Sequence, residues 1–128
     1  MNLFTIFYFF FVYTIELGAM LLINKYFYTF LDNNWDNFKN ISPLHKKWYV
    51  VSNLTKSIIF SFYSYHIYFI LSNYITYNQW NTNDFLYLGS IYSSIDMASI
   101  ILVPKLSNNT LYHHLVVNVL YFYTLLNG

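Results

Sequence analysis

The chain has 128 residues, of which 57% are hydrophobic, 24% aromatic and only 9% charged. Soluble domains carry about a quarter charged residues, and a short chain exposes more surface per residue than a long one. The composition therefore excludes an ordinary soluble domain and predicts a surface that meets lipid. The net charge is +1, with lysine as the only strongly basic residue, which excludes nucleic acid as a partner.

The residue types that are scarce exclude further classes of site. The chain has no cysteine, so disulfides, thiolate zinc ligands and cysteine nucleophiles are absent. Three glycines and two prolines leave no glycine-rich phosphate loop and no flexible linker.

The first apolar segment, residues 3–23, contains a single charge at Glu16. Its length is about the 20 residues that a membrane-spanning helix needs. A cleaved signal peptide is the rival interpretation, but no basic segment precedes it and an acid suits its apolar part poorly. We therefore predict a retained span, followed by a polar cytoplasmic loop over residues 24–47.

Three more apolar segments follow in the rest of the chain. Residues 48–74 form the second, interrupted by Lys56 and His66; residues 85–103 form the third, with Asp96 inside it. Proline and turn residues then precede the fourth, over residues 110–126, which is short for a full crossing. The predicted fold is an all-α polytopic membrane helix bundle with four transmembrane helices.

The lysines set the orientation of these spans. The loop between the first two spans and the loop between the last two hold five of them, whereas the middle loop has none. Lysine-rich short loops face the cytoplasm, so both termini are predicted to be non-cytoplasmic. The lysines in question are Lys25, Lys39, Lys46, Lys47 and Lys105.

This orientation places the polar residues of the four spans at similar depths. At about 1.5 Å per residue, Glu16 and Asp96 lie roughly 10 Å from the cytoplasmic ends of their helices and Lys56 roughly 12 Å. His113 and His114 lie roughly 5 Å deep. These groups are therefore expected to form one layer in the cytoplasmic half of the membrane.

A charge in hydrocarbon costs about 2.5–3.5 kcal/mol on insertion scales, so these groups should turn inward and pair. We expect Glu16 to pair with Lys56, and Asp96 to pair with one histidine. The alternative is that such pairs only hold the helices together, since polar contacts between membrane helices contribute about 0.6 kcal/mol on average.

The two adjacent histidines suggest acid–base chemistry rather than metal binding. Neighbouring side chains on a helix point about 100° apart, so His113 and His114 are not expected to share one metal ion or one carboxylate. No metal and no cofactor is therefore predicted. One imidazole would act as base or nucleophile, oriented by Asp96. A Ser/His/Asp site using Ser90 or Ser93 is a weaker hypothesis, because no nucleophile elbow is present.

Three segments resemble the TRAM–LAG1–CLN8 (TLC) domain family. Residues 47–52 (KWYVVS) resemble the start of that domain, where a basic residue and Trp lead into a span with Val-Ser. Residues 92–96 (YSSID) are similar to the family's Tyr-x-x-x-Asp, and residues 112–114 (YHH) match the His-His that opens the next span. The match covers residues 46–128 and corresponds to a truncated domain, with residues 1–45 forming the first transmembrane helix and a cytoplasmic loop.

The resemblance implies a role in sphingolipid- or ceramide-type lipid metabolism, transport or sensing in the endoplasmic reticulum or another endomembrane. Membrane lipids are the expected partners. If the chain is an enzyme, the resemblance implies ceramide-synthase-like N-acyltransfer from acyl-CoA. His113, His114 and Asp96 would then be catalytic, and Lys56, Tyr92 and Glu16 would contact the substrate.

Two other functions stay open at this point. The chain is a non-catalytic structural or assembly protein if the polar layer serves only helix packing. It is one part of a larger assembly if a homodimer partner or a second chain completes the bundle.

Overall fold

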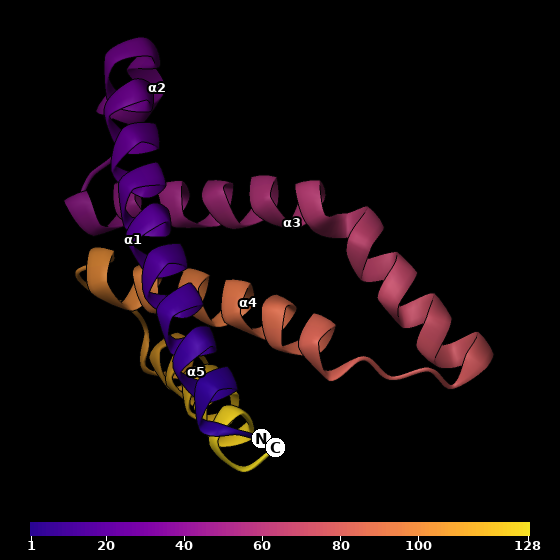
Figure 1. Cartoon of the computed structure of the whole chain (residues 1–128). Coiled ribbons are helices and arrows are strands. Elements are labelled where there is room, and N and C mark those ends of the chain that lie inside the picture. Colours follow the sequence, from indigo (N-terminus) through magenta and orange to yellow (C-terminus); the bar gives the residue numbers. More distant parts are fainter.

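The computed structural model describes residues 1–128, and all of its regular structure is helical, which confirms the all-α fold class. Helix α1 packs against α4 and α4 packs against α5, and α1 crosses both α3 and α4 at a wide angle (Figure 1). The predicted bundle of four transmembrane helices is thus confirmed only in its all-helical character. The helices in chain order are α1 (Leu3–Asn34), α2 (Asp36–Lys39), α3 (Leu44–Tyr77), α4 (Thr82–Leu102) and α5 (Asn108–Asn127).

Polar side chains cap the starts of three long helices. The side chain of Asn2 accepts a hydrogen bond from the backbone N–H of Thr5, at 2.8 Å. Asn81 and Ser107 accept equivalent bonds at the starts of α4 and α5. Asparagine and serine are preferred here because their oxygens satisfy amide groups that have no partner inside the helix. The predicted starts of these helices lie within three residues of the observed ones.

Helix α1 is longer than predicted. The loop expected over residues 24–47 is wrong in its first part, because α1 continues to Asn34. Polarity alone does not end a helix, and the segment holds no proline or glycine before Pro43. Asn24 is accommodated inside the helix, where its side-chain amide donates to the carbonyl of Met20 at 2.7 Å.

Helices α1 and α4 are long and apolar enough to cross a membrane. The spans predicted for α3 and α5 are less apolar, since serine, asparagine and histidine interrupt them. Large apolar side chains of α1 are exposed on its surface, among them Phe4 and Leu22. The chain thus has two helices of membrane-spanning character.

Helix α3 changes direction near its middle, and its second half leads away from the other helices (Figure 1). In the middle of α3, Ser61 donates a hydrogen bond to the carbonyl of Ser57, and Ser64 donates to the carbonyl of Ser61. Such bonds from a side chain to its own helix bend helices. The helix ends at Tyr77, and the next residue, Asn78, has the left-handed conformation that asparagine tolerates.

The turn from α1 to α3 is held by one ion pair and several aromatic rings. Lys47 on α3 lies 2.7 Å from Asp32 on α1, and the hydrogen bond raises the pKa of Lys47. The same ammonium lies 5.2 Å from the centre of the Phe38 ring, which is fully buried. This corner fixes where α3 begins.

The core joins α1, α4 and α5 at the end where the chain termini lie. It consists of aromatic and leucine side chains, together with a hydrogen bond of 2.6 Å from the hydroxyl of Tyr13 to the side chain of Asn118. The buried members are Phe9, Tyr13, Leu86, Tyr121 and Leu125.

Candidate functional site

The candidate site is built around Asp96, a carboxylate with 0% exposure on α4. The ammonium of Lys56, on α3, lies 2.8 Å from Oδ1 of Asp96. On the other side, Nδ1 of His114, on α5, lies 3.1 Å from Oδ2. One carboxylate therefore links three helices.

The expected pairing of Asp96 with a histidine is confirmed by this geometry. The expected pairing of Glu16 with Lys56 is wrong, because Glu16 accepts a hydrogen bond from Ser90. Ser90 and Asp96 are six residues apart on α4, which separates them by about 9 Å along the helix axis. Glu16 and Lys56 therefore contact α4 at different heights along its axis. The polar groups form two layers in place of the single layer that was expected.

His113 and His114 both lie near Asp96. One ligating atom from each of these three residues lies within 4.8 Å of the other two. Only His114 contacts the carboxylate, while Nε2 of His113 lies 3.4 Å from the hydroxyl of Tyr92, so the expectation that adjacent histidines do not share one carboxylate stays a prediction. The two ring centres are 5.7 Å apart.

Tyr92 connects this cluster to its surroundings. Its hydroxyl lies 3.4 Å from Nε2 of His113, and its ring lies 5.4 Å from the ammonium of Lys56. Of the predicted site residues, the structure therefore brings together Asp96, His113, His114, Lys56 and Tyr92, and it leaves Glu16 apart.

A small polar cavity of about 170 Å³ adjoins the cluster between α3 and α5. Lys56 and His114 form part of its wall. Ser52 and Ser99, whose hydroxyls hydrogen-bond to each other, also line it. Sequence reasoning missed this serine pair as part of the site, although Ser52 stands in the Val-Ser segment already singled out.

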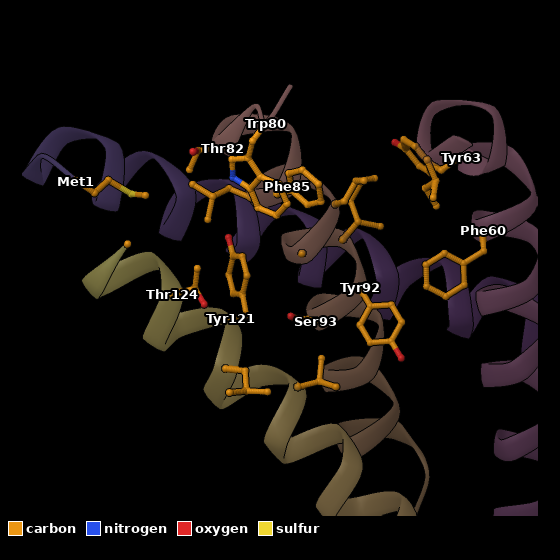
Figure 2. A pocket seen from close by; sticks show the side chains of 18 residues that line it. Met1, Phe60, Tyr63, Trp80, Thr82, Phe85, Tyr92, Ser93, Tyr121 and Thr124 are labelled. Carbon is orange, nitrogen blue, oxygen red and sulfur yellow. The ribbon is translucent and has the colours of Figure 1, made fainter. Parts of the chain in front are cut away.

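A larger apolar cavity of about 640 Å³ lies on the other side of Tyr92 (Figure 2). It extends over one face of α4 between α3 and α5, and most of its lining side chains are hydrophobic. At one end of the cavity the rings of Trp80 and Phe85 are stacked with their centres 3.6 Å apart, and at the other end Phe60 stacks on Tyr92. This volume lies within the range of about 300–1,000 Å³ typical of ligand pockets. No local sequence pattern indicates this cavity, because its residues come from several distant segments.

The arrangement suits acid–base chemistry better than serine nucleophile chemistry. A carboxylate in contact with an imidazole orients the ring and stabilises its protonated form. Ser90 donates its hydroxyl to Glu16, and Ser93 lies on the wall of the apolar cavity without a hydrogen bond to either histidine. Neither Ser90 nor Ser93 therefore takes the place of a nucleophile beside His113 or His114.

Comparison with protein-family models, with curated proteins and with solved structures found no match. Of the three segments singled out in the sequence, residues 92–96 and 112–114 are in contact through Asp96 and His114. Ser52, at the end of the segment 47–52, bonds to Ser99, one turn after Asp96 on α4.

Proposed function

We propose that this protein is an integral membrane protein that binds a lipid with its acyl chain in the apolar cavity and its polar group beside Asp96. The observation that carries the proposal is the position of Tyr92. Its ring forms part of the wall of the apolar cavity, while its hydroxyl and ring face contact His113 and Lys56. An amphiphile placed along Tyr92 would meet both environments at once.

The membrane setting is supported by α1 and α4, which have the length and apolar character of spans. Four crossings, with α3 and α5 included, would place the Asp96 cluster on the cytoplasmic side. Burial of an acyl chain contributes about 0.8 kcal/mol for each CH₂ group, so a cavity of this size favours a lipid over a small polar metabolite.

The lipid class we propose is the sphingolipid type that the TLC resemblance implies. Such lipids carry an amine or amide and hydroxyl groups, which the carboxylate of Asp96 and the two imidazoles are able to bind. In a ceramide-synthase-like reaction, the lipid amine would attack the thioester carbonyl of acyl-CoA, forming the amide bond as the C–S bond breaks. His114 would take the proton of the amine and pass it to the departing CoA thiolate while Asp96 holds the ring. The endoplasmic reticulum or another endomembrane would be the site of action.

A second candidate function is supported by the same cluster. Asp96, Lys56 and His114 tie α3, α4 and α5 together, and a structural or assembly protein needs nothing more from them. In that case the lipid cavity would have no specific occupant.

The test uses two adjacent valines of α5. Val117 lines the apolar cavity, whereas Val116 is exposed on the outer surface of the same helix. Protein in nanodiscs would be titrated with a fluorescent sphingosine. Val117→Trp fills the cavity, so we expect its affinity to fall about tenfold or more, while Val116→Trp keeps the affinity of the wild type.

A variant of the polar cluster completes this test. Asp96→Asn should weaken sphingosine binding while leaving the binding of an uncharged alkyl probe in place. Equal affinities of the two valine variants would contradict the proposal. Loss of folded protein in Asp96→Asn together with equal affinities of the valine variants would favour the structural function.

A further inference from the structure

Two buried atoms of the Asp96 cluster have no hydrogen-bond partner. They are Oδ2 of Asp96 and Nδ1 of His114, which lie 3.1 Å apart without the alignment of a hydrogen bond. Asp96 is fully buried and His114 is 7% exposed. Buried polar atoms without a partner are uncommon and costly, so their proximity points to a ligand that both atoms are able to hold.

We propose that Asp96, His113 and His114 bind one divalent transition-metal ion of the zinc type. Two imidazoles and one carboxylate form a ligand set that occurs in zinc sites with three protein ligands, where the fourth position is open to water. Calcium and magnesium prefer six or more oxygen ligands, which this cluster does not offer. The same three side chains face the polar group of the proposed lipid, so metal binding and the base role of His114 are alternative uses of one cluster, and metal binding is measured without lipid.

The distances require only a small closure of the site. The three ligating atoms lie within 4.8 Å of one another. Atoms that each bind zinc at about 2.0–2.1 Å in a tetrahedral site are about 3.3 Å apart. His113 is exposed and held only by its 3.4 Å contact with Tyr92, so its ring is free to make this adjustment.

Lys56 is compatible with this site because it occupies the other oxygen of Asp96. Its ammonium donates to Oδ1 and leaves Oδ2 to the ion. Carboxylates that bind metals are commonly hydrogen-bonded through an outer group in this way. The positive charge nearby lowers the affinity, so we expect micromolar rather than tighter binding.

The polar cavity supplies a path for the ion. His114 lies on its wall together with Ser52, Asn53 and Thr110. These neutral polar groups are able to bind a hydrated ion on its way to Asp96.

The experiment measures metal binding by the purified full-length protein in detergent after treatment with a chelator. Co²⁺ is added first, and its visible absorption reports four-coordinate geometry; Zn²⁺ is then added to displace it. We expect one ion per chain, and a loss of affinity of about tenfold or more in His113→Ala, His114→Ala and Asp96→Asn.

The other two histidines provide the controls. His45→Ala and His66→Ala remove imidazoles outside the cluster and should keep the affinity of the wild type. His113 is exposed, so His113→Ala is expected to fold even if Asp96→Asn does not. Absence of the four-coordinate spectrum in the wild type, or an equal loss of affinity in His113→Ala and His66→Ala, would overturn the proposal.

Discussion

The carboxylate of Asp96 has two charged or polar partners, the ammonium of Lys56 and the imidazole of His114. The carboxylate is fully buried, whereas the side chain of Lys56 is 27% exposed. A lysine at the edge of a buried acid donates to the carboxylate while its own chain reaches solvent or lipid headgroups. The pair therefore contributes to holding α3 on α4, together with the bond between Ser52 and Ser99.

Replacement of this lysine tests this contribution directly. Lys56→Met leaves the buried carboxylate with one partner, and removal of one member of a buried pair costs about 3–5 kcal/mol. Because Lys56 is partly exposed, we expect a loss near the lower end, measured by thermal unfolding in detergent.

Two further variants serve as controls for the effect of Lys56→Met. Asp96→Asn combined with Lys56→Met should recover part of the loss, because the uncompensated charge is then gone. Lys46→Met removes an exposed lysine in the first turn of α3 and should leave the unfolding temperature unchanged. A loss in the double variant as large as the sum of the single losses would show that the pair is not coupled.

Residue types and their spacing were enough to predict the contact of Asp96 with a histidine, since both lie near the same end of adjacent helices. The partner of Glu16 was not predictable in this way. Its choice between Ser90 and Lys56 depends on the register between α1 and α4, which interlocking side chains set and which periodicity in one helix does not reveal.

At the scale of helices, the close approach of α4 and α5 depends on Gly89. A Cβ at this position would lie 3.1 Å from Cδ2 of Tyr121, which is tighter than an ordinary contact. Tyr121 is buried in the core and also lines the apolar cavity. Any displacement of its ring therefore affects both packing and the volume of the cavity.

Gly89→Ala is predicted to destabilise the protein by about 1 kcal/mol. Overpacking costs about 1–3 kcal/mol, and the better helix propensity of alanine offsets about 0.5–1 kcal/mol of this destabilisation. Gly18 on α1 is the matched control, because a Cβ there meets nothing within 4 Å. Gly18→Ala should be neutral or stabilising in the same thermal unfolding measurement; equal losses in both variants would show that the contact with Tyr121 is unimportant.

The sequence predicted the later helices more closely than the first. Turn residues before α4 and α5 also cap them, so the composition and the hydrogen bonding agree there. Polarity after residue 23 suggested a loop, but a polar segment without proline or glycine remains helical when its side chains find partners. The wide crossing of α3 over α1 also depends on the corner at Lys47, which brings together segments that no local pattern links.

For the whole molecule, the number of crossings decides where the Asp96 cluster lies. Four crossings with cytoplasmic lysine-rich loops predict that residues 35–43 and 103–107 share one side of the membrane. The loop at residues 78–81 would then share the other side with the termini. The absence of cysteine allows a clean test, because each introduced cysteine is the only thiol in the chain.

In this test, Lys39→Cys and Lys105→Cys should react with a membrane-impermeant maleimide that is added to the cytoplasmic side of the membrane. Gln79→Cys should react only with maleimide added to the opposite side. All three residues lie outside the contacts of the site. Labelling of Gln79→Cys from the same side as Lys39→Cys would mean that α3 does not cross, and that only α1 and α4 are spans.

Met1 and Gly128 lie close together and both line the apolar cavity. Their proximity restricts the number of times the chain crosses the membrane. Each crossing moves the chain through about 30 Å of hydrocarbon, so ends that meet require an even number of crossings. Two crossings by α1 and α4 satisfy this rule and so do four, whereas three would separate the ends by the full thickness of the membrane. If α1 and α4 both span the membrane, we expect helices α3 and α5 either both to enter the bilayer or both to stay out of it.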